Sequence, residues 1–260
     1  MTFYDSKGNK VKEVELLYAR PETGITSGFF SEDGNYLVVN IMDNEEKEIF
    51  SSGTGVILFD NLGEELWRFE TEEESAGPLY ISSEGKHIIA ESHNWGRDEE
   101  GMTDLIKRIT YLLDREGHLI RKYSNLMSSP GTFSSSGNYA IVCDAPTRKT
   151  YLLDTKTGDR LLELKRGLIR NVCIAEEAKL IGITYNNKIE LIQFNGVKAW
   201  SHEVSDPKYL WVSDDGSKIT AISDEKKTLR LDNGKEMTVS GNKKILRFEK
   251  ENKNERGYYE

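Results

Sequence analysis

A short polar motif recurs along the chain, and its repetition restricts the possible folds more than any other feature of the sequence. It first occurs as FSEDGNYLVV, from Phe30 to Val39, and similar stretches follow as ISSEGKHIIA, FSSSGNYAIV and VSDDGSKITA. Asp33-Gly34 and Asp215-Gly216 are dipeptides typical of tight hairpin turns, because glycine adopts a positive φ without steric cost. Each copy therefore predicts a strand, a tight turn and a second strand.

A second hairpin follows each copy of the first. In its usual form an apolar strand ends in Asp, a turn containing glycine follows, and another strand leaves the turn. Asp60, Asp114, Asp154 and Asp232 stand at the same turn-starting place, where an Asp side chain can accept hydrogen bonds from backbone N–H groups two residues on. The second hairpins are expected over 56–69, 110–123, 150–164, 189–200 and 228–239, and an additional hairpin of this type over 2–16.

Two hairpins in each repeat give four strands. Stacking four-stranded sheets radially buries both faces of each sheet and leaves only short edges, so the sequence predicts an all-β protein with a β-propeller fold. FSEDGNYLVV and its copies resemble the first hairpin of WD40-like, PD40-type propeller repeats, and LFDNLGEELWRF resembles the outer hairpin of quinoprotein-type propellers. The resemblance covers residues 1–250 and implies the fold rather than a function. The Trp-Asp dipeptide of true WD40 repeats is absent.

The number of blades depends on how the two ends of the chain are used. The polar turns begin at Ser31, Ser82, Ser134, Ala175 and Ser213, which gives five first hairpins against six second ones. We favour six blades, with the last blade shared between the C-terminal strand over 243–250 and the N-terminal hairpin, which closes the ring. The alternative is a five-bladed ring with irregular ends, since terminal repeats are often atypical. We expect a single domain over 1–250 and a disordered tail over 251–260.

The fourth repeat departs from the pattern. Its turn reads AEEAK, and Ala178 stands where the other copies have glycine. A residue other than glycine in the left-handed region costs about 1–2 kcal/mol. If this turn matches the others, Ala178→Gly is expected to stabilise the fold by about 1 kcal/mol, and if the turn is of another type it is not.

Charge and composition exclude several classes of function. The formal net charge of −9 argues against nucleic-acid binding, which needs a basic surface, and favours a basic protein or peptide as the partner, a bound cation or simple solubility. No apolar stretch is long enough to span a membrane and the first residues form no secretory signal, so a cytoplasmic protein without membrane contact is expected. Cys143 and Cys173 lie in apolar runs and are expected to be buried thiols. No motif for a metal or another cofactor is found.

The insertions all lie at one end of the predicted blades. Segments 42–55 and 92–108 join the second and third strands of the first two repeats, and segment 70–77 joins these repeats. All three are acidic, and we expect them to be neighbours in space. His93, Trp95, Arg97 and Asp98 fall in an exposed loop of this acidic face and are candidate partner-binding residues, because Trp and Arg are frequent at binding hot spots. The alternatives are that Trp95 folds back to anchor its own loop and that the acidic face is only a solvated surface. The leading hypothesis is a non-catalytic scaffold that uses these residues to hold a protein or peptide.

A second set of polar residues is expected near the mouth of the central channel. Asn40 and Glu91 occupy matching places at the end of the second strand, and Asp144 and Tyr185 lie one step further on. They could line a wet channel, or they could form the site of a hydrolase or lactonase-like propeller enzyme or of a small-ligand sensor. No catalytic residue is assigned, because the sequence holds no catalytic motif.

Overall fold

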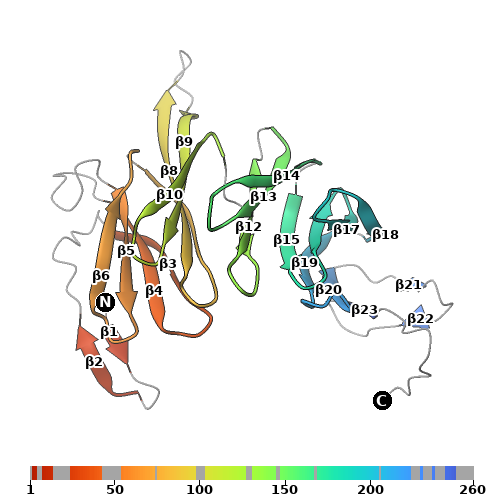
Figure 1. The fold of residues 1–260 in the computed structure, drawn as a ribbon, viewed down its shortest axis with the longest axis horizontal. Helices are drawn as coiled ribbons and strands as arrows, with labels where there is room; N and C mark the ends of the chain where they lie inside the picture. Colours follow the sequence, from red (N-terminus) through yellow and green to blue (C-terminus); the bar gives the residue numbers. More distant parts are fainter. Residues whose placement is uncertain are drawn as a thin grey trace. The chain divides into compact units, whose positions relative to one another are not determined.

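The structure of the chain is a computed structural model, and it describes residues 2–4, 8–13, 24–42, 54–73, 75–97, 103–126, 131–144, 147–166, 169–204, 206–223, 229–230, 236–237 and 244–249. Its internal contacts divide the chain into two compact units, Met1–Glu163 and Leu164–Glu260, and each is described by itself. Every regular element in the described residues is a strand, which confirms the all-β prediction (Figure 1).

Four sheets share one arrangement, in which four consecutive strands are neighbours in the order of the sequence. Sheet 1 holds β3 (Gly24–Phe30), β4 (Tyr36–Met42), β5 (Thr54–Asp60) and β6 (Glu65–Glu70). Sheet 2 holds β7 (Ser75–Ile81), β8 (His87–Arg97), β9 (Thr103–Asp114) and β10 (Leu119–Ser124). Sheet 3 holds β11 (Thr132–Phe133), β12 (Tyr139–Asp144), β13 (Lys149–Asp154) and β14 (Arg160–Lys165), and sheet 4 holds β15 (Ile169–Ala175), β16 (Leu180–Tyr185), β17 (Lys188–Gln193) and β18 (Lys198–Glu203).

Burial follows the place of each strand in its sheet. The middle strands β4 and β5 are buried along nearly their whole length, whereas the outer strand β6 alternates between exposed and half-buried residues. A strand that is covered on both faces needs a continuous apolar run, and YLVVNIM and TGVILFD supply it. The apolar side chains of sheets 1 and 2 form one core cluster, made of Val38, Val56, Leu58, Leu79, Ile88, Ala90, Ile109, Tyr111 and Leu113.

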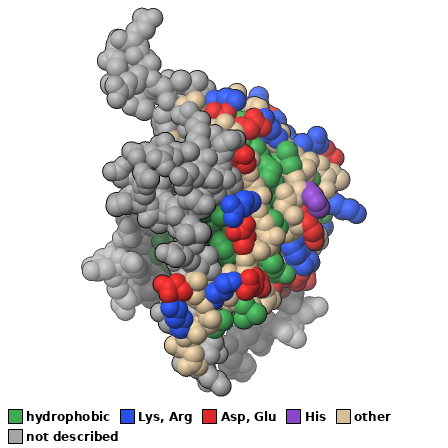
Figure 2. Space-filling model, turned by 90° about the vertical axis from the view of Figure 1, so that its left-hand side faces the viewer, with side chains coloured by type: hydrophobic (Ala, Val, Ile, Leu, Met, Phe, Trp, Pro, Cys, Tyr) green, Lys and Arg blue, Asp and Glu red, His purple; other side chains and the backbone are tan. Residues whose placement is uncertain are grey.

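The outer surface of the first unit carries charges of both signs. Figure 2 shows the side of the molecule on which β2 (Lys10–Glu13) and β6 lie in Figure 1, and its Lys/Arg and Asp/Glu side chains are interspersed. Arg68 and Glu65 form an ion pair within β6, and Lys12 reaches Glu64. Ion pairs this exposed contribute little to stability.

The recurring polar turns have one hydrogen-bond pattern. In four of them the first residue is a serine whose Oγ accepts a hydrogen bond from the backbone N–H five residues on, at 2.9–3.1 Å. The glycine three residues after each serine has a φ between 66° and 75°, as the hairpin prediction requires. These serine–glycine pairs are Ser31 and Gly34, Ser82 and Gly85, Ser134 and Gly137, and Ser213 and Gly216.

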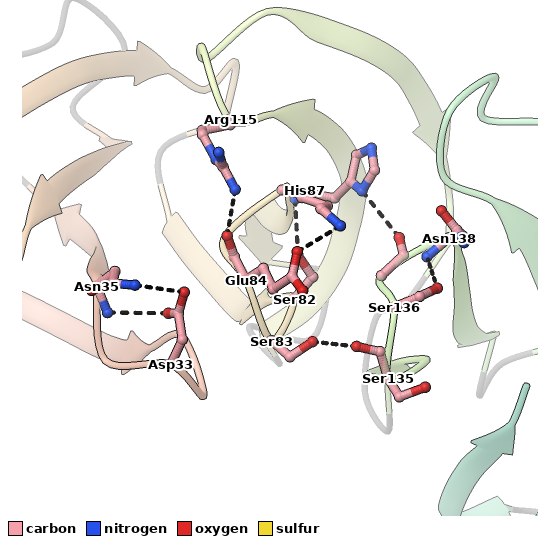
Figure 3. A network of polar contacts seen from close by, with 12 residues as sticks. Asp33, Asn35, Ser82, Ser83, Glu84, His87, Arg115, Ser135, Ser136 and Asn138 are labelled. Carbon is pink, nitrogen blue, oxygen red and sulfur yellow. Dashed lines mark hydrogen bonds and ion pairs between the residues drawn. The ribbon is translucent and has the colours of Figure 1, made fainter. Parts of the chain in front are cut away.

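The polar turns also join neighbouring sheets, which explains why the motif is repeated. In the first unit the Asp33 N–H donates to Ser83 O at 3.1 Å, and the Ser83 hydroxyl donates to Ser135 O (Figure 3). His87 Nδ1 lies 3.0 Å from Gly137 O, so this ring nitrogen carries the proton. Each turn thus satisfies backbone groups of the next turn in addition to its own.

The second hairpins make a matching set of contacts. The Trp67 indole donates to Arg115 O at 2.6 Å and packs over Gly117, where a Cβ atom would come within 2.7 Å of the ring. Arg121 takes the place of Trp67 in sheet 2, and its side chain packs over Gly158 of sheet 3. As predicted, the side chains of Asp60, Asp114 and Asp154 accept hydrogen bonds from the backbone of their own turns, and Asp232 lies outside the described residues.

The fourth polar turn has the same length as the others but a different hydrogen-bond pattern. Ala175 pairs with Leu180 as Ser31 opposes Tyr36, so four residues separate the two strands in each case. The closing hydrogen bond of the fourth turn runs from Lys179 N to Glu176 O, and the positive φ of 53° belongs to Lys179 rather than to Ala178.

The Ala178 N–H donates to Asp214 O, just as the Asp33 N–H donates to Ser83 O in the first unit. The strand pairing nevertheless aligns Ala178 with Gly34, and the Phe194 N–H donates to Lys179 O as the Thr155 N–H donates to Asn138 O. The alignment therefore holds, but the turn is of another type, with its left-handed residue one position later. The condition for Ala178→Gly to stabilise the fold is not met.

The end of the chain differs from the expected arrangement. The fifth sheet has the order β19 (Pro207–Val212), β20 (Lys218–Ser223) and β23 (Lys244–Glu249), so the C-terminal strand takes the third place in this sheet. The hairpin expected over 228–239 forms a separate pair, β21 (Leu229–Arg230) with β22 (Glu236–Met237), and β1 (Thr2–Tyr4) pairs with β2. The edge of β20 needs a partner for its backbone groups, and KILRFE offers a longer apolar strand than TLRLD. Ring closure and the choice between five and six blades remain predictions.

Candidate functional site

The described residues of the three acidic connections contact one another. The Thr54 hydroxyl, at the end of the first insertion, lies 2.6 Å from the Thr71 hydroxyl and donates to Glu73 O in the connection between sheets 1 and 2. Lys107, at the end of the second insertion, places its Nζ 2.5 Å from Glu73 Oε1. The prediction that these connections are neighbours is confirmed for these residues. The contact with Glu73 raises the pKa of Lys107, so the lysine stays charged.

Tyr111 of β9 holds the connection between sheets 1 and 2 by a hydrogen bond to its backbone. The Glu72 N–H donates to the Tyr111 hydroxyl at 2.8 Å, and Ser92 Oγ lies 3.2 Å from the same oxygen. Burial raises the pKa of Tyr111, so the phenol is neutral at physiological pH. The backbone of this acidic connection is therefore held in place by sheet 2.

A buried ion pair lies on the face of the β8–β9 hairpin opposite to Tyr111. Glu91 and Arg108 are 2% and 12% exposed, and Glu91 Oε1 is 3.0 Å from Arg108 Nε and 3.9 Å from His93 Nδ1. The three residues share one face, because side chains alternate along a strand and His93 pairs with Arg108 across the hairpin. Burial, and then the neighbouring Arg108 charge, lower the pKa of His93. The imidazole is therefore neutral at physiological pH, and the ion pair is limited to Glu91 and Arg108.

Two of the four residues expected at the channel mouth converge on one glycine. The Asn40 side-chain amide donates to Gly77 O at 2.7 Å, and the Glu91 side chain packs against Gly77, where an added Cβ would lie within 2.8 Å of it. Only glycine fits here, because β7 has a bulge at this point that brings its backbone against Glu91. Asn40 thus links sheet 1 to sheet 2 at the base of the acidic connections.

Asp144 and Tyr185, the other two residues expected at the channel mouth, also have local partners. The carboxylate of Asp144 accepts hydrogen bonds from the backbone and hydroxyl of Thr147, which caps the turn after β12. In the second unit, Tyr185 has a pKa raised to about 12 by desolvation and by its hydrogen bond to Glu190. Glu190 in turn lies 3.0 Å from Arg166 Nε. These local contacts account for the positions of Asp144 and Tyr185 without a ligand.

The residues expected in a loop lie mainly on a strand, so that prediction was wrong in part. His93, Trp95 and Arg97 belong to β8, and Asp98 lies outside the described residues. β8 and β9 have 11 and 12 residues, and they extend beyond the other strands of their sheet (Figure 1). The pairing of β7 with β8 ends at Ser75 and His93, whereas β8 and β9 stay paired as far as Arg97 and Thr103. The insertion is therefore a two-stranded ribbon that projects from sheet 2.

Nearly all the net charge of the chain belongs to the three connections. Segments 42–55, 70–77 and 92–108 carry formal charges of −3, −4 and −1, which is −8 of the −9 of the whole chain. They leave sheets 1 and 2 from the same end, because each joins a second strand to a third or one sheet to the next. We call the three segments together the acidic end. A field of one sign over a limited surface attracts and orients partners of the opposite charge.

Sequence reasoning missed the residues that support this region, namely Gly77, Glu73, Lys107, Arg108 and Tyr111. The alternation of the β8–β9 hairpin could have placed Arg108 beside Glu91, because both lie on the same face of a continuous strand pair. The contacts of Gly77 and Glu73 cross between sheets, and no local pattern predicts them.

The described residues contain no cluster of three or more His, Cys, Asp or Glu side chains that could hold a metal ion. Within the same residues no helix has the length and apolar character needed to cross a membrane. Both cysteines are free thiols, and burial raises the pKa of Cys143 to about 11.

Comparison with known proteins gives the fold. No protein-family model matches the chain, and no curated protein matches its sequence. A solved structure described as the eukaryotic initiation factor is similar with a TM-score of 0.52 and 12% identity, over 85% of this chain and 56% of that one. A chain of a mitotic checkpoint complex is similar with a TM-score of 0.53 and 13% identity, over 84% of this chain and 64% of that one. This chain thus spans less than two thirds of either protein, and these likenesses to WD40-type propeller proteins show that it has a β-propeller fold.

Proposed function

We propose that this protein is a non-catalytic scaffold that binds a basic protein or peptide at its acidic end. The observation that carries the proposal is the charge distribution, with −8 of the net −9 in three connections that leave neighbouring sheets at one end. The described parts of these connections are held together by Thr54, Thr71, Glu73 and Lys107. A preformed surface loses little conformational entropy on binding, which favours affinity.

The projecting ribbon gives this surface its anchors. Trp95 and Arg97 lie on β8 beyond the last pair with β7, and Trp and Arg are the residues most often found at binding hot spots. In this proposal the acidic segments accelerate encounter with a basic partner, and the ribbon supplies the contacts that hold it. The two similar solved structures, an initiation factor and a mitotic checkpoint complex, are consistent with a role in protein assembly.

The test compares two variants that remove the same number of charges from opposite ends of the sheets. Glu46, Glu99 and Glu100 are changed to Gln at the acidic end, and Glu32, Glu84 and Glu177 are changed to Gln at the polar turns. A partner captured from extract of the source cells is purified and titrated against both variants and the wild type at several salt concentrations. We expect the acidic-end variant to bind about tenfold more weakly with a smaller salt dependence, and the control to match the wild type. Equal losses in both variants, or no loss in either, would overturn the proposal.

The alternative, a propeller enzyme or small-ligand sensor at the channel mouth, has less support. Asn40, Glu91 and Asp144 each have an internal partner in Gly77, Arg108 or Thr147, and these contacts account for their positions. A change in melting temperature on adding Ca²⁺, Zn²⁺ or a lactone would revive this alternative.

A further inference from the structure

The edge of the β8 ribbon offers a specific way to hold the partner. β7 covers this edge of β8 only as far as His93, which pairs with Ser75, and the chain of β7 comes from the acidic segment 70–77. Among the described residues, no strand pairs with Asn94–Arg97 on the side away from β9. A strand edge with free backbone N–H and C=O groups is a template for pairing with another chain.

The direction of the backbone groups along β8 can be worked out from its pairing. His87 O accepts a hydrogen bond from Ser82 N, on the β7 side of the strand. Backbone groups in a strand alternate between the two edges, and the inserted residues of the neighbouring bulges lie in β7 and β9, so β8 keeps its alternation. The odd-numbered residues of β8 therefore face the β7 side. Trp95 and Arg97 direct their N–H and C=O groups toward the open edge.

The other edge of the ribbon is less suitable. β10 leaves β9 after Ser124, because Asn125 has a φ of 60° and turns the chain away while donating its N–H to Arg108 O. Residues Thr103–Lys107 then follow without β10, but Ile106 is the extra residue of a bulge opposite Asn94 and Trp95. A bulge interrupts the regular spacing of backbone groups, and this protects an edge from pairing.

We propose that the open edge of β8 at Trp95 and Arg97 takes up a basic, extended segment of the partner as an added strand. The inference rests on the proposed function and specifies how the partner is held. Charge decides among the possible occupants. A second copy of this chain would bring another net charge of −8 to the same place, and the acidic segment 43–53 of this chain would add to the like charges of segment 70–77. A strand with Lys or Arg at alternate positions meets opposite charge while its backbone pairs with β8.

The first experiment separates backbone pairing from charge attraction. The probe is a fluorescent peptide Lys-Val-Lys-Val-Lys-Val, compared with an analogue that is N-methylated at every residue and with Glu-Val-Glu-Val-Glu-Val. The N-methylated analogue keeps the charge but has no backbone N–H to donate. Fluorescence anisotropy with the wild-type chain should show binding of the first peptide, at least about tenfold weaker binding of the N-methylated analogue, and no binding of the acidic peptide.

The second experiment uses matched variants of the chain. Arg97→Pro removes the N–H that faces the open edge, whereas Arg97→Ala removes the same side chain and keeps this N–H. Proline is tolerated on an edge strand when its nitrogen faces outward, so neither variant should unfold the ribbon, and melting curves check this. We expect the basic peptide to bind Arg97→Pro about tenfold more weakly than Arg97→Ala.

The outcomes distinguish the two proposals. If the N-methylated analogue binds as well as the basic peptide, or if both Arg97 variants bind alike, strand addition is refuted while charge-driven docking stands. If neither basic peptide binds, both proposals lose their support. If the wild type forms a dimer in sedimentation experiments that Arg97→Pro abolishes, a second copy is the occupant and the inference of a basic partner is wrong.

Discussion

Replacing Lys179 by glycine tests the different turn type of the fourth repeat and the physical reason for the glycine in the other four. Lys179 has a φ of 53°, in the region that L-residues avoid, and its Nζ lies 5.4 Å from the centre of the Phe194 ring. Lys179→Ala removes the contact with Phe194 and keeps the Cβ atom, whereas Lys179→Gly removes both. The difference in unfolding free energy between these two variants isolates the cost of the left-handed conformation.

The expected difference follows from two opposing terms. The left-handed conformation costs a residue with a Cβ atom about 1–2 kcal/mol. Glycine also lowers the unfolding free energy by about 0.4–1 kcal/mol, because an unfolded chain with glycine has more conformational freedom to lose on folding. Lys179→Gly should therefore be about 0.5–1 kcal/mol more stable than Lys179→Ala. For a chain of this size that corresponds to a melting temperature about 1–4 °C higher.

Ala178→Gly is the matched control from the neighbouring position. Ala178 has no positive φ, and its Cβ occupies the space beside Gly216, so glycine here loses packing and adds chain entropy. We expect a loss of about 1 kcal/mol in urea unfolding followed by circular dichroism. If Ala178→Gly stabilised the protein, or if Lys179→Gly were no more stable than Lys179→Ala, the assignment of the left-handed residue of this turn to Lys179 would be wrong.

Three further predictions concern the first unit. Gly117→Ala should lower the unfolding free energy by more than about 2 kcal/mol, because its Cβ would collide with the Trp67 indole. Gly34→Ala, at a similar φ but with open space around it, should lower it by about 1 kcal/mol. Equal losses in thermal melts would contradict the Trp67–Gly117 contact. Arg108→Met should destabilise by about 3 kcal/mol by leaving a buried carboxylate unpaired, and adding Glu91→Gln should restore part of that loss; an additive double-mutant cycle would rule out the ion pair. The Cys143 thiol has a folded-state pKa raised to about 11 by burial, so its contribution to stability is fully present below about pH 9, the ordinary thiol value, and is lost as the pH rises through 11. Urea titrations at pH 8 and pH 10.5 should show a smaller decline in Cys143→Ala than in the wild type, and parallel declines would contradict this.

Much of the fold could be predicted because the repeat is local. Ser31, Gly34 and Asp60 act within their own hairpins, through hydrogen bonds that span five residues or fewer, so their spacing in the sequence is their spacing in the structure. The type of the fourth turn could not be predicted from sequence, since AEEAK has no glycine to mark the residue with the positive φ. The structure places this φ at Lys179, and the Ala178 N–H of the same turn donates to Asp214 O in the next repeat.

The candidate site divides in the same way. The sequence alone determined that the acidic segments lie at one end, because strand alternation and short connections leave no other arrangement. It also marked His93, Trp95 and Arg97, but as loop residues, because a run with Asn, Gly and Asp reads as a turn while its cross-strand partners are unknown. Tertiary structure decided that these residues form a projecting strand.

What the sequence by itself determined is therefore the strand order, the turn chemistry and the end of the sheets that carries the charge. These depend on interactions between residues close together in the chain, whose geometry the covalent structure constrains. Tertiary structure alone decided the pairing of β23 with β20, the meeting of Asn40 and Glu91 at Gly77, and the open edge of β8. Each of these depends on competition between distant segments for the same backbone groups or the same space, and a local pattern holds no information about which segment arrives there.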